Sequence, residues 1–107
     1  NRDHRIVHEA VRVACRPVPG CTVRRLLCFE TPSATEWGSG TFAPSVFVDV
    51  SGEPWDRKQR ALAHYASEMR EYPHPRSFES ILALARWRGS MSGLQLAEAF
   101  ELVREVR

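Results

Sequence analysis

Apolar residues recur at helical spacing in three stretches of the chain. Residues 3–15 and 54–70 each place their apolar residues on one helix face, and Pro54 suits the first turn of the second stretch. A third helix is expected to begin after Ser77, whose hydroxyl can cap it, and to end near Gly89. The expected apolar faces are formed by Ile6, Ala10 and Ala14; by Trp55, Leu62, Tyr65, Ala66 and Met69; and by Phe78, Ile81, Leu82 and Ala85.

Two short apolar runs predict strands that are buried on both faces. The first is Val23–Phe29, and the second is Val46–Val50, which is interrupted by Asp49. A carboxylate in such a run must face a polar edge or have a partner. The segment 30–44 between them is rich in Thr, Ser, Gly and Pro and is expected to be a loop. The tail 94–106 fits a helix better than a strand by its periodicity.

Strands separated by helices predict an α/β fold. We expect one domain over residues 1–107, forming part of a Rossmann-like layered fold with a short, mostly parallel sheet and about three helices. A sheet of two or three strands with two apolar faces needs further strands beside it. The chain also begins at Asn1, without a methionine, inside a possible motif. Both features predict that it is the C-terminal portion of a longer domain.

Composition narrows the function classes. The chain has 107 residues, of which 43% are hydrophobic and 26% charged, as in ordinary globular proteins. Its net charge of +2 gives no strong field for nucleic acid, and no known nucleic-acid-binding motif is present. No apolar run approaches the roughly 18 residues of a membrane span. We therefore expect a cytoplasmic protein with no nucleic-acid partner and no membrane span.

The three cysteines argue against a disulfide framework, because their number is odd and no C-x-x-C occurs. Cys28 lies in an apolar run and is expected to be a small core residue. Cys15 and Cys21 flank a turn and could pair, although reduced thiols suit a cytoplasmic protein better.

Asp3 and His4 stand at the expected start of the first helix. A neutral imidazole is a good zinc ligand, and a nearby carboxylate can orient it. The bare pair is more often a helix cap beside a surface histidine. His4 and His8 are four residues apart and could chelate one metal, but structural zinc sites take about four ligands. For His8 we therefore favour a solvated side chain.

Two loops carry candidate ligand-binding side chains. His74 lies between two prolines that fix the direction of its imidazole, and Arg76 offers a planar fork for an anionic or hydroxyl-rich ligand. This segment either lines a polar pocket or merely connects two helices, and its spacing fits both equally. Glu36 and Trp37 follow a strand end, where ligands gather in open α/β sheets. Trp37 could stack on a sugar face or pack on the core, and Glu36 could accept hydrogen bonds from sugar hydroxyls.

Seven segments, spread over nearly the whole chain, occur in the same order as in a known family. They are Asn1-Arg2-Asp3-His4-Arg5-Ile6-Val7, Phe29-Glu30-Thr31-Pro32-Ser33, Thr35-Glu36-Trp37-Gly38, Phe47-Val48-Asp49-Val50, Tyr72-Pro73-His74-Pro75-Arg76-Ser77, Ala85-Arg86-Trp87-Arg88-Gly89 and Ala97-Glu98-Ala99-Phe100. Taken together, they resemble the second half of the zinc-dependent de-N-acetylases of the PIG-L/LmbE family.

The resemblance implies a Rossmann-like metal-dependent hydrolase, usually with zinc, that removes the acetyl group from N-acetylglucosamine-type substrates or related amides. It would make His4 the third zinc ligand and Asp3 its supporting partner. Asn1 would occupy the position where some relatives carry a histidine that stabilises the oxyanion. The resemblance gives His74 and Arg76 a substrate-side role. It also implies that residues 97–100 form a strand, against the periodicity.

One departure from the family pattern limits these implications. The other two metal ligands and the catalytic Asp of the family lie in a His-Pro-Asp-Asp segment, which the 107 residues do not contain. Catalytic zinc needs about three protein ligands and a water. We therefore expect the C-terminal part of a zinc-dependent de-N-acetylase, inactive alone, that takes zinc only with the missing N-terminal half. The alternative is a non-catalytic remnant that forms homo-oligomers through its sheet edge and can bind a sugar-like ligand.

Overall fold

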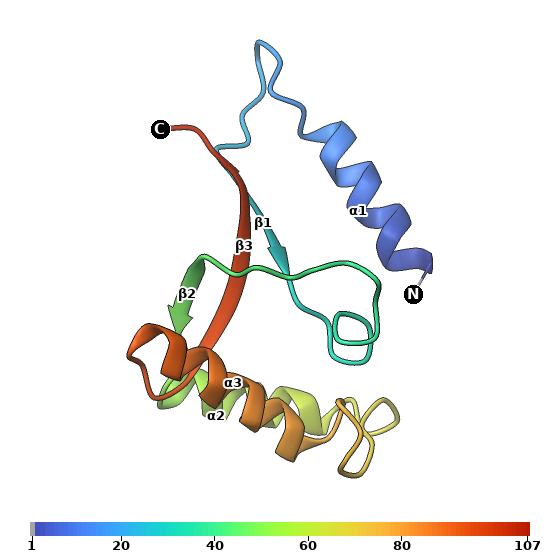
Figure 1. The fold of residues 1–107 in the computed structure, drawn as a ribbon, viewed down its shortest axis with the longest axis vertical. Helices are drawn as coiled ribbons and strands as arrows, with labels where there is room; N and C mark the ends of the chain where they lie inside the picture. The colour runs from blue at the N-terminus through green and yellow to red at the C-terminus, as the bar shows by residue number, and fades with distance from the viewer. Residues whose placement is uncertain (1) are drawn as a thin grey trace.

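The computed structural model describes residues 2–107, which form three helices and one three-stranded sheet (Figure 1). Helix α1 lies beside one end of the sheet, and α2 and α3 lie together at the other end (Figure 1). The elements are, in chain order, α1 (Arg2–Ala14), β1 (Arg25–Phe29), β2 (Val46–Asp49), α2 (Glu53–Ala63), α3 (Phe78–Ser92) and β3 (Ala97–Glu105).

The sheet has the order β1-β3-β2, and both outer strands run antiparallel to β3. Arg25 lies opposite Glu105 in one ladder, and Asp49 lies opposite Ala97 in the other. The prediction of a mostly parallel, Rossmann-like sheet is therefore wrong. β1 and β2 share a direction, as that prediction required, but the C-terminal strand lies between them and opposes both. The segment that joins β1 to β2 is the predicted loop, and it contains no crossover helix of the kind that adjacent parallel strands need.

The tail is a strand, so the helix favoured by its periodicity is wrong, and the strand implied at residues 97–100 is confirmed. Ala97 and Ala99 are buried while Glu98 and Phe100 are only half-buried, which is the period-two pattern of a strand. The spacing of Leu96, Phe100 and Val103 also fits a helix, which is why periodicity alone misassigned this segment.

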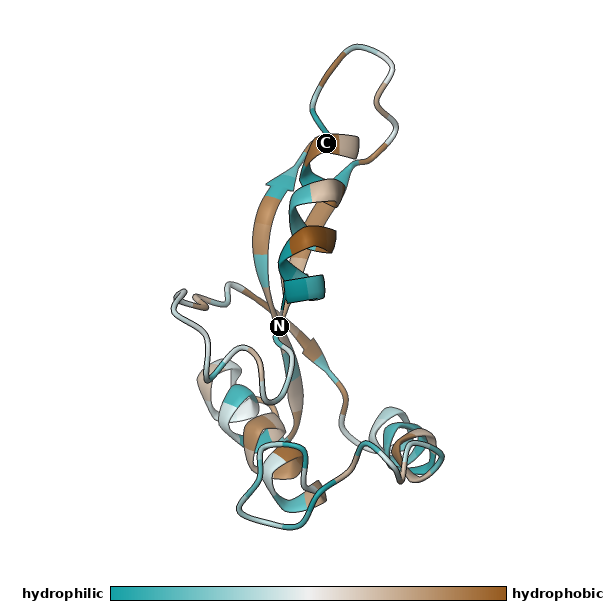
Figure 2. Ribbon diagram, turned by 90° about the vertical axis from the view of Figure 1, so that its right-hand side faces the viewer, coloured by the Kyte–Doolittle hydropathy of each residue, from teal (hydrophilic) through white to brown (hydrophobic). Residues whose placement is uncertain are grey.

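The main core lies where α2 and α3 meet the sheet. Trp55, Ile81 and Ala85 are buried there. Half-buried apolar side chains surround them: Val50, Leu62, Met69, Leu82 and Leu96. Figure 2 shows hydrophobic segments in α3 and in the strands beside it. The apolar face predicted for the second helix and the one predicted for the third together supply most of this core.

Ser77 caps α3 as predicted, because its buried hydroxyl accepts a hydrogen bond from the backbone N–H of Ser80 at 3.0 Å. The predicted end near Gly89 is three residues too early, since the helix runs to Ser92 and Gly93 forms its left-handed C-cap at φ 76°. Helix α2 ends at Ala63 instead of residue 70, and Tyr65 is exposed.

The two outer strands are not buried on both faces, contrary to the prediction. Phe29 is 71% exposed, and Cys28 is only half-buried, so Cys28 is not a core residue. Asp49 faces solvent at the end of β2, and its Oδ1 accepts a hydrogen bond from the Ser51 N–H at 2.9 Å. Hydrogen bonding with Ser51, first through its side chain and then through its backbone, lowers the pKa of Asp49 below its ordinary value.

Helix α1 has the predicted position but buries no side chain, because a groove separates it from β1. The three thiols are free, so Cys15 and Cys21 do not pair. Over residues 2–107, each helix is too short or too polar to cross a bilayer.

Candidate functional site

Two loops that are distant in the sequence bring a tryptophan and a histidine together. Trp37 follows β1, and His74 lies between α2 and α3. Their ring centroids are 5.4 Å apart at an interplanar angle of 81°, which is an edge-to-face contact. Trp37 remains 64% exposed, so much of its ring stays open to a ligand. The structure therefore places two of the residues expected to bind a sugar side by side.

The orientation of His74 is fixed by its own loop. The backbone N–H of Arg76 donates a hydrogen bond to His74 Nδ1 at 3.0 Å. A neutral imidazole that accepts at Nδ1 carries its proton on Nε2. His74 is therefore held as a hydrogen-bond donor through Nε2. In the same turn, the backbone N–H of His74 donates to the backbone carbonyl of Glu71. The prolines on either side of it add to this stiffness.

Arg76 lies beside His74, and one side of its guanidinium is neutralised. Its Nη1 donates to Glu68 Oε2 at 2.8 Å. Its Nε is buried, and no acceptor for it exists among residues 2–107. The backbone carbonyl of Arg76 accepts from Arg70, which ties the two ends of this loop together. Arg76 thus holds a planar donor group in place within the loop that carries His74.

Glu36 does not join this cluster in the way that was expected. Its Oε1 accepts a hydrogen bond from the backbone N–H of Ser33. Nearby, the Thr31 N–H donates to Thr35 Oγ1 at 2.7 Å. Glu36 and Thr35 therefore close the turn that presents Trp37, and the expected role of Glu36 as an acceptor for sugar hydroxyls stays a prediction.

The expected metal ligand lies across a groove from the same loop. His4, in the first turns of α1, lines this groove together with Thr31, which begins the loop that carries Trp37. Figure 1 shows the start of α1 beside this loop. Asp3 precedes His4 on the exposed first turn of α1, and Asn1 lies outside the described residues.

The part of the chain that the structure describes does not form a metal site by itself. Among residues 2–107, no group of three or more His, Cys, Asp or Glu side chains could hold a metal ion. The Nδ1 of His8 lies 3.9 Å from Cys28 Sγ. A catalytic zinc takes about three protein ligands, so zinc does not fit these residues without ligands from elsewhere.

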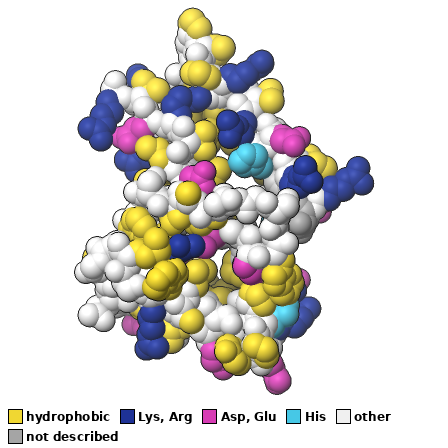
Figure 3. All heavy atoms as spheres, in the orientation of Figure 1, with side chains coloured by type: hydrophobic (Ala, Val, Ile, Leu, Met, Phe, Trp, Pro, Cys, Tyr) yellow, Lys and Arg dark blue, Asp and Glu magenta, His cyan; other side chains and the backbone are white. Residues whose placement is uncertain are grey.

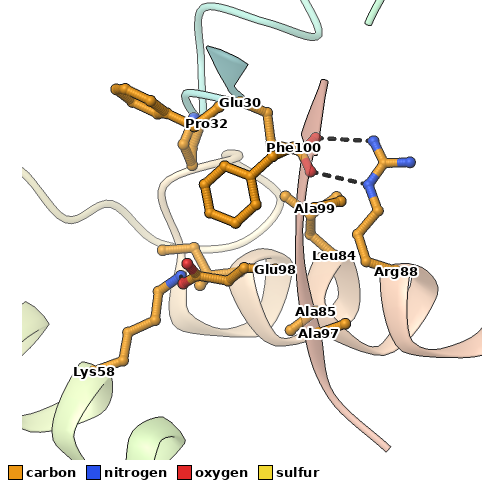
Figure 4. A pocket seen from close by; sticks show the side chains of 12 residues that line it. Glu30, Pro32, Lys58, Leu84, Ala85, Arg88, Ala97, Glu98, Ala99 and Phe100 are labelled. Carbon is orange, nitrogen blue, oxygen red and sulfur yellow. Dashed lines mark hydrogen bonds and ion pairs between the residues drawn. The ribbon is translucent and has the colours of Figure 1, made fainter. Parts of the chain in front are cut away.

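Below the loop that carries Trp37, a pocket of about 260 Å³ lies between the sheet and the two C-terminal helices (Figure 4). Arg88 on α3 forms two hydrogen bonds of 2.9 Å with Glu30, the residue that follows β1. Both side chains are only 14% exposed. On the other side of the pocket, Lys58 bonds Glu98 at 2.5 Å.

The Arg88–Glu30 pair is the part of the site that the sequence did not reveal. The sequence gives no hint that Arg88 has a partner 58 residues away. The pair anchors the start of the Trp37 loop to α3. The other loop of the site, which carries His74, leads into the same helix. The pair thus ties the start of one loop to the helix into which the other loop leads.

Comparison of the chain with protein-family models, curated proteins and solved structures found no match.

Proposed function

We propose that this chain is the C-terminal, substrate-side part of a zinc-dependent de-N-acetylase that hydrolyses the acetamide of an N-acetylglucosamine-type substrate, and that it is inactive alone. The observation that carries the proposal is the contact between Trp37 and His74, with Arg76 beside them. These side chains come from two of the segments that resemble the PIG-L/LmbE family. His4 would supply one zinc ligand, and the others would come from a His-Pro-Asp-Asp segment outside these residues.

The three side chains have complementary roles toward a sugar. The exposed ring of Trp37 offers an apolar surface for the C–H face of a pyranose. His74 Nε2 donates to a hydroxyl or to the acetamide carbonyl, since its Nδ1 is already engaged. Arg76 adds a charged donor that Glu68 keeps in place. Together they bind and orient an uncharged, hydroxyl-rich ligand.

N-acetylglucosamine should bind weakly to the chain and perturb the NMR signals of the Trp37 indole and the His74 ring. Trp37→Ala should weaken binding about fivefold, because an aromatic contact contributes roughly 1 kcal/mol. Trp87→Ala is the matched control, since Trp87 on α3 is 62% exposed and lies outside the site. If the two variants bind the sugar equally well, the proposed site is wrong.

The catalytic part of the proposal concerns zinc. Joined to a segment with the His-Pro-Asp-Asp pattern and loaded with zinc, the chain should release acetate from an N-acetylated sugar, whereas the chain alone should release none. His4→Ala and a chelator should each abolish this activity, and His64→Ala, at the exposed end of α2, should not. A folded, zinc-loaded joined protein that hydrolyses none of a panel of N-acetylated sugars would contradict the enzymatic proposal.

A second candidate is a non-catalytic protein that forms homo-oligomers through its sheet edge. The observation in its favour is that β1 and β2 each have one unpaired edge within the described part of the sheet. In that case the sugar site remains, but no acetate is released by the joined protein, so the zinc experiment separates the two candidates. For either one, we propose a cytoplasmic location, where free thiols stay reduced.

A further inference from the structure

The groove between α1 and β1 is an apolar concave surface of the described residues, and the proposed function uses none of its lining apart from His4. It has a volume of about 390 Å³. Val7 and Val11 form one wall, Leu26 and Phe29 form the other, and Val103 of β3 also lines it. Val7, Val11 and Phe29 remain exposed, so no other part of the described chain covers them.

Among the described residues that line this groove, the charged side chain is that of Arg12. His4, His8 and Arg12 are four residues apart on α1 and form one row along the groove. No Asp or Glu of residues 2–107 lines it. Arg12 carries a full positive charge and makes no ion pair with any described residue. An apolar groove with a cationic rim complements a ligand that is apolar along its length and anionic at one end.

The surroundings reinforce this charge. Residues 1–25 contain six arginines (Arg2, Arg5, Arg12, Arg16, Arg24 and Arg25) and two acidic residues, Asp3 and Glu9. In Figure 3, dark blue side chains gather over the half of the molecule that contains α1. The local excess of positive charge attracts anions to the groove, although the net charge of the whole chain is only +2.

We propose that this groove binds a single-chain anionic amphiphile, a medium-chain carboxylate whose head lies at Arg12 and whose alkyl chain runs toward Phe29. The row from His4 to Arg12 spans eight residues, which is about 12 Å along a helix. A volume of about 390 Å³ lies within the range of pockets that hold one small ligand. The proposal does not depend on zinc or on the sugar site.

Chain length gives the first test. Hexanoate, octanoate and decanoate, titrated into the full chain below their micelle concentrations, should bind with an affinity that rises about twofold to fourfold for each added methylene. Decyltrimethylammonium, with the opposite charge, should bind more weakly than decanoate. An affinity independent of chain length, or a preference for the cation, would refute the site. So would attachment to anionic vesicles without binding of free decanoate.

Matched variants on the same helix give the second test. Arg12→Gln should weaken decanoate binding about fivefold, whereas Arg5→Gln, also on α1 but outside the groove, should leave it unchanged. Val11→Asp should abolish binding, and Val13→Asp, outside the groove, should not. All four positions are exposed on a helix that buries no side chain, so circular dichroism should show the same fold throughout. Equal losses within either pair would overturn the proposal.

Discussion

Arg88→Met is expected to destabilise the protein by about 3 kcal/mol, the lower end of the range for breaking a buried ion pair. The loss arises because Glu30, only 14% exposed, would keep its charge without the two 2.9 Å hydrogen bonds that Arg88 now donates. Urea unfolding followed by circular dichroism would measure the change. A small domain has about 5–15 kcal/mol of stability in total, so the transition midpoint should fall markedly.

The chain offers a close control for this prediction. Arg86→Met changes the same residue type two positions earlier on α3, where the side chain is exposed and forms no ion pair with a described residue. Its effect should lie within about 0.5 kcal/mol. The double variant Glu30→Leu, Arg88→Met should recover most of the lost stability, because the orphaned charge is then removed as well. Equal midpoints for Arg86→Met and Arg88→Met would show that the pair does not stabilise the fold.

The pair also links stability to the proposed site. Glu30 is the last residue before the turn that carries Trp37, and α3 begins directly after the loop that carries His74. Loss of the pair removes the bonds that join the start of the Trp37 loop to α3. Arg88→Met should therefore weaken sugar binding at temperatures where the variant is still folded, although neither residue belongs to the Trp37–His74–Arg76 cluster.

The helices were predictable because their sequence signals are local. Ser77 followed by the apolar face of Ile81 and Ala85 defines α3 without knowledge of the rest of the chain. The direction of the strands was not predictable in the same way. Two apolar runs on either side of a loop fit parallel and antiparallel sheets equally well, and β3 decides between them. The spacing of Leu96, Phe100 and Val103 hid that strand, whose alternation of Ala97 and Ala99 with half-buried residues becomes evident only in the sheet.

The candidate site was predictable to a similar extent. Trp37, His74 and Arg76 were identified as residues that suit a sugar, and the fold brings the rings of Trp37 and His74 together. The role of Glu36 was not predictable, because an acceptor for a ligand and an acceptor for its own turn look the same in the sequence. The Arg88–Glu30 pair was hidden for another reason: it joins residues far apart in the chain, and only the packing of α3 against the sheet creates it.

Gly89→Ala is expected to destabilise the protein by about 2 kcal/mol or more, although alanine is the better helix former. The connection from α3 to β3 passes so close to Gly89 that a Cβ there would lie 2.5 Å from the carbonyl oxygen of Leu94 and 2.9 Å from that of Gln95. Both are backbone atoms that cannot rotate away, so α3 and the connection that follows it would have to move apart. This close approach explains why a glycine stands inside the helix and not at its end, where the sequence had suggested it. Thermal unfolding would measure the effect.

Ser90→Ala, on the exposed face of the same helix, is the control and should change stability by no more than about 0.5 kcal/mol. A Gly89→Ala variant more stable than the original protein would mean that the backbone of the connection at Leu94 and Gln95 does not approach α3 so closely, and the helix would then have no steric need for a glycine at this position.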